Sequence, residues 1–443
     1  MKVSWRQRGD RLEFRFDPGS GDNAAHRAVP MFRHHFRAEM PPGWEADRTH
    51  PDLLAAAAFL AARPFVGEAI RFPVGISSRL AGALPIPAGP TDPRLDPRPL
   101  PIHGVPALAY SGGMDSTAAL ALLPPAAEAV HLLRQTPPLL AAGGSVRRVL
   151  APRRRRLHLK YRPEAALYAV EGIHRMGRTA LVVPCDIEFL NLPIGFPVDI
   201  ANAVPALLLA DLRGYDSIAF GTVMESAYSV GRARFADYRK RQHFIQYGAL
   251  LDAIGLPFLQ VTAGISEVGT TRIVAASPYA AVAQSCVRGR PGDPCLNCYK
   301  CFRKTLLAAA VSGADIDPAL ADRLARIPEA QAQMRRPWMK HENVLAYAIR
   351  HYHGGHRILR LLRRRVRGDS LRVRWMERWY PPAAELLPAH RRAEAAEAIR
   401  LALEPMSPGQ QATAEAWDLA PALASPDYRR RRARLITALE EYS

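Results

Sequence analysis

The sequence predicts an α/β protein with a doubly wound parallel sheet, an N-terminal α+β extension and a C-terminal helical extension. Strand-forming apolar runs alternate with helical patterns between residues 105 and 285. Eight prolines lie within 84–106, which marks a linker. Beyond residue 302 the pattern is helical. We therefore expect domains at 1–100, 101–305 and 306–443.

The first hundred residues show structure but no motif that carries chemistry. Apolar and polar residues alternate over 2–17 on both sides of Gly9-Asp10, which predicts a hairpin. Residues 51–62 have a helical pattern and 68–74 an extended one. A small accessory unit is the simplest interpretation.

The central region is expected to build a ligand cleft. We expect strands at 129–133, 179–184, 217–222 and 258–262, and helices at 163–176, 198–213 and 235–254. Ligands of such sheets bind beyond the carboxyl ends of the strands. The turn from Gly221 to Ser226 should therefore face this cleft, with Glu225, Ser226 and Tyr228 as substrate candidates or, equally, as exposed loop residues.

The main motif is Ser111-Gly112-Gly113-Met114-Asp115-Ser116, which follows an apolar run and precedes an alanine- and leucine-rich run. This order indicates a strand, a loop and a helix. The glycines let the backbone approach an anion, and the free amides of the helix start point at it. The loop lacks the lysine of Gly-x-x-x-x-Gly-Lys nucleotide hydrolases. A polyphosphate is the expected ligand.

The second motif consists of four of the five cysteines. Cys286 is followed by eight residues and then by Cys295, Cys298 and Cys301 at two-residue spacings. Four thiolates at such spacing suit one tetrahedral Zn²⁺, and an iron-sulfur cluster is the less favoured alternative. A closed site of this kind is structural. Cys185 follows an apolar strand and is expected in the core, with a catalytic thiol as the alternative.

The formal net charge is +19, which suits an anionic partner. Arginine dominates the basic residues, as a GC-rich genome alone would produce, so a nucleic-acid partner is the less favoured interpretation. The same holds for two basic tracts, 356–374 (with Trp375 and Trp379 beside it) and 429–434, which we interpret as charged faces of amphipathic helices. The run 153–156 is interpreted as a solvated loop face, with an acidic partner as the less favoured alternative. Long apolar runs and a leader are absent, so we expect a cytoplasmic protein without a membrane partner.

Helices are expected in the C-terminal part, at 302–312, 317–326, 339–353, 387–403, 408–420 and 427–441.

Together, the Ser-Gly-Gly-Met-Asp-Ser loop and the cysteine spacing about 170 residues later resemble the 7-cyano-7-deazaguanine synthase (QueC) family of pyrophosphate-loop ATP pyrophosphatases. The resemblance covers roughly 105–305. It implies an adenine-nucleotide-hydrolase-like, Rossmann-like fold that uses ATP and Mg²⁺. It also implies that Zn²⁺ is bound by the four cysteines, and that Ser111, Gly112, Gly113, Asp115 and Ser116 hold phosphate, with Ser111 and Asp115 catalytic.

Family members adenylate 7-carboxy-7-deazaguanine, release pyrophosphate, and form an amide and then a nitrile with ammonia. The resemblance therefore implies an ATP-dependent C–N ligase acting on a carboxylate. QueC-like proteins of anti-phage operons are thought to use a protein amine instead, and long terminal extensions would suit such a protein acceptor.

The family's substrate motifs are weak in this chain. Phe196–Asn202 replaces an Arg-Asn pair, and the stretch Phe235-Ala-Asp237-Tyr-Arg239 only loosely matches Tyr-Pro-Asp-Cys-Arg. Gly221, Glu225, Ser226, Asp237 and Arg239 are the candidate substrate residues. Two alternatives are a tRNA or nucleobase thiolation enzyme, which needs a reactive thiol or an iron-sulfur cluster, and a nonenzymatic nucleotide- or nucleic-acid-binding module.

Overall fold

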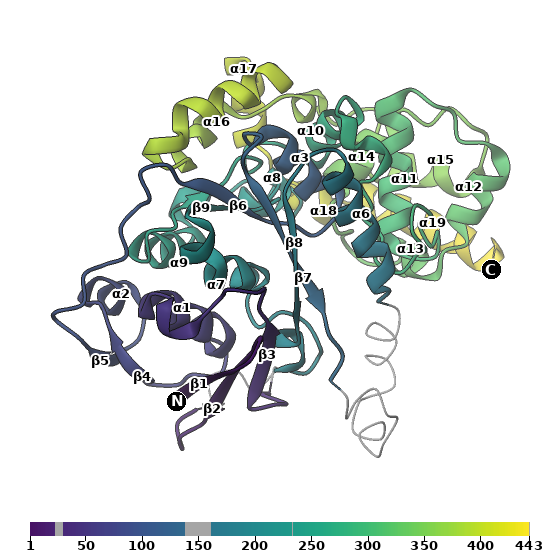
Figure 1. Ribbon diagram of the computed structural model, residues 1–443. Coiled ribbons are helices and arrows are strands. Elements are labelled where there is room, and N and C mark those ends of the chain that lie inside the picture. Colours follow the sequence, from purple (N-terminus) through teal and green to yellow (C-terminus); the bar gives the residue numbers. More distant parts are fainter. Residues whose placement is uncertain (23–29, 138–160, 233, 443) are drawn as a thin grey trace.

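The computed structural model describes residues 1–22, 30–137, 161–232 and 234–442. In these residues, ten strands form one mostly parallel sheet in the order β10-β9-β6-β7-β8-β3-β2-β1-β4-β5 (Figure 1). The strands are β1 (Lys2–Arg8), β2 (Arg11–Asp17), β3 (His35–Glu39), β4 (Ile70–Ile76), β5 (Ala88–Thr91), β6 (Val105–Ala109), β7 (Glu128–Arg134), β8 (Ala180–Cys185), β9 (Tyr215–Ala219) and β10 (Phe258–Leu259). The tetra-arginine run 153–156 lies outside the described residues.

The parallel half of the sheet is built outward from β6. Strands β7 and β8 follow on one side, and β9 and β10 lie on the other, all parallel. Alternate residues of β6 enter different cores: Ala107 packs with α7 (Val204–Arg213), and Leu108 packs with α3 (Met114–Leu122) and α6 (Pro163–Arg175). Helices therefore cover both faces. Successive strands are added on one side of β6 (β7, β8) and then on its other side (β9, β10), so the strand order reverses at β6. Ligands of open α/β sheets bind where the strand order reverses.

The N-terminal strands extend this sheet. The hairpin over 2–17 is confirmed as antiparallel β1 and β2. Strand β3 joins β2 to β8 through the pairing of Ala38 with Cys185. The sheet therefore crosses the boundary that we expected near residue 100. The proline-rich segment 84–106 is also fixed, since β5 lies within it and buried Arg98 donates to the carbonyls of Gly255 and Tyr215.

The central and N-terminal helices differ from the sequence expectation mainly at their starts. Helix α7 begins at Val204 instead of residue 198, because Pro205 belongs in a first helical turn. The helix expected over 235–254 begins only at residue 242, after a 3₁₀ turn at Tyr238–Lys240. The helices outside the C-terminal part are α1 (Pro51–Ala62), α2 (Ser78–Ala83), α3, α6, α7, α8 (Met224–Ala227), α9 (Gln242–Ala253) and α10 (Glu267–Ala275).

The C-terminal part is helical, and Figure 1 shows most of its helices, coloured green to yellow, above and to the right of strands β6 to β9. Three helices that the sequence pattern did not reveal, α13, α15 and α18, lie among the expected ones. The full set is α11 (Tyr299–Ser312), α12 (Pro318–Ala325), α13 (Pro328–Met334), α14 (Glu342–Arg350), α15 (Arg357–Arg365), α16 (Ala389–Ala402), α17 (Pro408–Glu415), α18 (Ala420–Ala424) and α19 (Pro426–Tyr442). Within the described ranges, no helix combines the length and apolarity needed to cross a bilayer.

Candidate functional site

The Ser111–Ser116 loop connects β6 to α3 in a tight turn. Gly112 adopts a φ of 74°, and a Cβ added there would lie 3.0 Å from the Cβ of Ala169. Both features favour glycine. The hydroxyl oxygens of Ser111 and Ser116 lie 3.0 Å apart, and Ser116 also donates to the carbonyl of Gly113. The two serines thus join the first and the last residue of the loop.

The start of α3 retains free donors. Among the residues that the structure describes, the backbone amides of Gly113 and Asp115 donate to no group. The amide of Met114 is different, since it donates to Oγ of Ser285 at 3.0 Å. Free amides at a helix N-terminus attract anions through their partial positive charge. The loop can therefore accept a phosphate group.

Asp115 is fixed by residues from two other helices. Its Oδ1 accepts hydrogen bonds from Thr270 of α10 at 2.8 Å and from Nζ of Lys304 of α11 at 3.1 Å. Its Oδ2 accepts none from the described part of the chain. The side chain is 29% exposed. Asp115 is thus held in place with one oxygen left for a ligand, and a carboxylate oxygen is a ligand that Mg²⁺ accepts.

A buried charge cluster surrounds Asp115. Lys304 also contacts Glu267 at 2.9 Å, and Arg303 pairs with the same carboxylate. Nδ1 of His341 lies 2.9 Å from Oε1 of Glu267. Burial alone would raise the pKa of Glu267, but Lys304 and Arg303 hold it well below its usual range. Glu267 is therefore a buried anion that fixes the cations next to the loop.

Glu225, at the start of α8, behaves in the opposite way. Its two oxygens accept hydrogen bonds from the amide of Glu267 at 2.9 Å and from Asn343 at 3.0 Å. Burial, followed by the charge of Glu267, raises the pKa of Glu225 well above its usual range. Carboxyl groups whose pKa values are driven apart by their surroundings are typical of functional sites.

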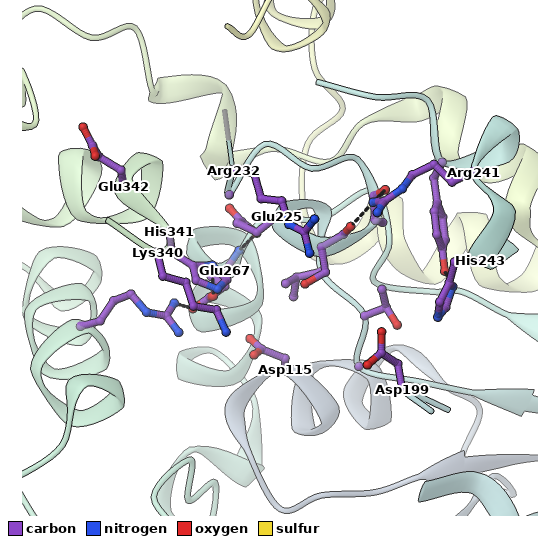
Figure 2. A pocket seen from close by; sticks show the side chains of 18 of the residues that line it. Asp115, Asp199, Glu225, Arg232, Arg241, His243, Glu267, Lys340, His341 and Glu342 are labelled. Carbon is purple, nitrogen blue, oxygen red and sulfur yellow. Dashed lines mark hydrogen bonds and ion pairs between the residues drawn. The ribbon is translucent and has the colours of Figure 1, made fainter. Parts of the chain in front are cut away.

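A cavity of about 780 Å³ lies beyond the carboxyl ends of β6 and β9, and its lining includes Asp115, Glu225, Glu267, Arg303 and His341. In the view of Figure 2, Arg232 and Lys340 reach toward the side on which Asp115 lies, and His243 lies on the side of Asp199. Apolar groups also line the cavity, among them Ile200, Phe220, Trp338, Met339, Leu419 and Leu423. The cavity therefore combines cationic groups with apolar ones and has room for an organic ligand.

The four cysteines of the second motif gather as the spacing predicted. Their sulfur atoms all lie within 4.8 Å of one another. Sulfurs held at about 2.3 Å from one tetrahedral Zn²⁺ are about 3.8 Å apart, and Sγ of Cys295 and Sγ of Cys301 lie 3.8 Å apart. The cluster could hold a metal ion, and its geometry is compatible with Zn²⁺.

The chain segments on both sides of the cysteine cluster contact the Ser111–Ser116 loop. Before Cys286, the amide of Gln284 donates to the carbonyl of Gly112 at 2.8 Å, and Ser285 accepts from Met114. After Cys298, which caps α11, the chain enters the helix that carries Lys304. The cluster thus positions both the back of the loop and the lysine bound to Asp115.

The predicted substrate residues occupy different environments. Gly221, Glu225 and Ser226 line the cavity. Gly221 also touches the loop, because a Cβ there would lie 2.5 Å from the amide nitrogen of Ser116. Asp237 and Arg239 bind each other at 2.9 Å, and Arg239 also pairs with Glu385 outside the cavity.

Two further candidates are buried away from the cavity. Tyr228 is 1% exposed and stacks on Phe235, with ring centroids 5.3 Å apart. Cys185, the last residue of β8, is fully buried, and burial raises the pKa of its thiol. A thiol of this kind is a core group, as the sequence predicted, and is poorly suited to nucleophilic catalysis.

Sequence reasoning missed most of the cationic side of the site. Lys300 lies between Cys298 and Cys301, and Arg303 and Lys304 follow Cys301. Their helical i, i+3 and i+4 spacing places these three residues on one face of α11. That spacing was a usable signal. The sequence held no comparable signal for Thr270 and His341, because their contacts with Asp115 and Glu267 depend on how α10 and α14 pack against α11.

Comparisons with known proteins give limited information. No curated protein and no solved structure matches the chain. Residues 246–418 match the model of a protein family that is described as a family of unknown function (DUF6395). The matched region includes the four clustered cysteines, Glu267, Thr270 and Lys304. It excludes Cys185 and the Ser111–Ser116 loop.

Proposed function

We propose that this protein is a QueC-like, ATP-dependent ligase that adenylates a carboxylate, releases pyrophosphate and joins the acyl group to an amine. The observation that carries the proposal is the placement of Asp115. This residue lies in a strand-loop-helix turn with free amides, is held by Thr270 and Lys304, and borders the cavity. The strand order around β6 further supports a doubly wound, adenine-nucleotide-hydrolase-like fold.

The proposed phosphate site divides the work among several groups. The amides of Gly113 and Asp115 and the hydroxyl of Ser111 would donate to the pyrophosphate part of ATP. Oδ2 of Asp115 would hold Mg²⁺, which neutralises charge on the departing pyrophosphate. Arg232 and Lys340, which are exposed at the cavity, would contact the same phosphates.

The reaction has two balanced steps. A carboxylate oxygen of the substrate attacks the α-phosphorus of ATP, the bond to the bridging oxygen breaks, and pyrophosphate leaves. An amine then attacks the carbonyl carbon, an amide bond forms, AMP leaves with the bonding electrons, and the amine loses a proton to water. Donors placed where charge develops lower the barrier of the first step.

The cysteine cluster would bind Zn²⁺ in a structural role. Its four sulfur ligands leave no open position for a substrate. Gln284 and Ser285, just before the cluster, bond to Gly112 and Met114, and α11 begins within the cluster, so the metal would support the loop through these neighbours. Metal analysis with about one zinc and no iron per chain would agree with this role.

The proposal is tested by incubating the protein with ATP, Mg²⁺ and a panel of carboxylates that includes 7-carboxy-7-deazaguanine. We expect equal amounts of AMP and pyrophosphate, and formation of ADP and phosphate would refute the proposal. Tight ATP binding without turnover on any carboxylate would instead support the nonenzymatic binding module. Cys185 is fully buried and offers no accessible thiol for thiolation, so that alternative would need an iron-sulfur cluster at the four cysteines.

A further inference from the structure

Two basic tracts that are far apart in the sequence meet in one groove. The end of α15 and the start of α19 pack side by side (Figure 1). Between them lies a cavity of about 310 Å³. We call it the arginine groove, and it is lined by Arg363, Arg364, Arg367, Arg430, Arg431 and Arg434, together with Leu361, Asp369, Ser370 and Asp427.

The arginine groove carries excess positive charge. Six arginines face two aspartates, which leaves four uncompensated positive charges. Arg363 pairs with Asp369, and Arg430 and Arg431 share Asp427. The side chains of Arg364 and Arg434 are exposed and bind no group in the described part of the chain. Such a surface attracts a polyanion.

The groove adjoins the candidate site through α18. A second cavity, of about 400 Å³, shares Arg367, Asp427 and Arg431 with the arginine groove and reaches Pro421 and Ala422 of α18. Leu423 of the same helix lines the 780 Å³ cavity, as does Leu419 just before it. A single short helix therefore separates the two regions, and a long ligand in the groove would lie next to the site.

We propose that the arginine groove binds the phosphate backbone of a nucleic acid without reading its sequence. Protein interfaces have apolar and aromatic cores, whereas Leu361 is the one apolar residue that lines the 310 Å³ cavity. Guanidinium groups bind phosphates bidentately and make up much of protein–DNA contact. Trp375 and Trp379 are buried, so these two aromatics give no platform for base stacking.

The test measures binding to a fluorescein-labelled DNA duplex by anisotropy while salt is varied between about 50 and 200 mM. The double variant Arg364→Gln with Arg434→Gln should weaken binding about tenfold and reduce the slope of log K against log salt by about 1.8, since each phosphate contact contributes about 0.9. The proposal goes beyond ATP turnover, and this variant should leave turnover of a small carboxylate unchanged.

The matched control is Arg6→Gln with Arg8→Gln, which removes the same charge from exposed positions of β1. It should bind like the wild type. Replacing Arg364 and Arg434 with lysine should retain most of the binding, because lysine still neutralises phosphate. Equal losses in both glutamine variants, or wild-type binding that does not respond to salt, would overturn the proposal. Tighter binding of polyglutamate than of DNA would overturn it in favour of an acidic protein.

Discussion

The carboxylates of the N-terminal strands and those around the cavity meet basic residues in different ways. On β2, Glu13 accepts hydrogen bonds from Arg15 and Arg37 at 2.6 Å each. Burial would raise its pKa, but the two arginines lower the pKa of Glu13 to about 2. Around the cavity, Lys304 is shared between Asp115 and Glu267, and burial raises the pKa of Glu225.

The ion pairs of Glu13 have the features of a stabilising network, whereas the carboxyl groups around the cavity have those of a binding site. A carboxylate with its own arginines at a partly exposed strand contributes only to folding. Around the cavity, burial raises the pKa of Glu225 while Lys304 and Arg303 lower that of Glu267, and both groups border the space where a ligand would sit. Substitutions in the cavity network are therefore expected to lower stability and activity far more than substitutions in the network of the N-terminal strands.

The largest effect should follow loss of a cysteine ligand. Cys301→Ser removes one of the four sulfurs, so bound zinc should fall from about one per chain to near zero, as measured by elemental analysis of the purified protein. The melting temperature should fall as well, since metal binding is coupled to folding. Cys185→Ser is the control and should keep its zinc, because Cys185 lies in the core at the end of β8, paired with β3. Full zinc retention in Cys301→Ser would contradict a four-cysteine site.

Lys304→Met should be the most destabilising change within the charge cluster. It leaves Asp115 and Glu267 without their shared cation, and breaking a buried ion pair in this way costs about 3 to 5 kcal/mol of unfolding free energy. The matched change in the N-terminal strands, Arg37→Gln, should cost about 1 kcal/mol, since Arg37 is 34% exposed. Urea unfolding measures both. Similar losses would remove the distinction between the two networks.

Asp115→Asn should reduce pyrophosphate release about 100-fold or more, comparable to removing one preorganised group from a transition-state site. The asparagine keeps the shape and the contact with Thr270 but loses the charge. Asp237→Asn is the control, because Asp237 binds Arg239 outside the cavity. Equal activity losses in the two variants would mean that Asp115 has no special place in the reaction.

The sequence predicted those parts of the site that depend on local structure. The Ser111–Ser116 loop and the cysteine cluster could be placed because strand, glycine turn, helix and ligand spacing are encoded within a few residues. The contact of Lys304 with Asp115 could not, since it joins residues 189 positions apart through the packing of α11. The arginine groove is similar, because neither tract alone shows that α15 and α19 meet.

Glu225→Gln should change how the free energy of unfolding depends on pH. A folded-state pKa above the unfolded value means that the folded protein binds more protons, so wild-type stability falls as pH rises from about 4.5 through the folded pKa. The variant cannot lose that proton. Its stability relative to the wild type should therefore rise with pH, by about 1.4 kcal/mol for each pH unit that separates the folded pKa from the unfolded pKa, in urea unfolding between about pH 5 and 9. A difference independent of pH would contradict the raised pKa.

Glu13→Gln should give the smallest effect, with the opposite sign. Because the pKa of Glu13 is lowered to about 2, the stability that its charge contributes is present above about pH 4.5 and is lost as pH falls toward 2. We expect a loss of about 1 kcal/mol or less at pH 7, since Arg15 is 59% exposed and solvent screens the pair. The difference should vanish near pH 2. A difference that instead grew on acidification would show that Glu13 is destabilised by its surroundings, like Glu225, and that the two networks do not differ in kind.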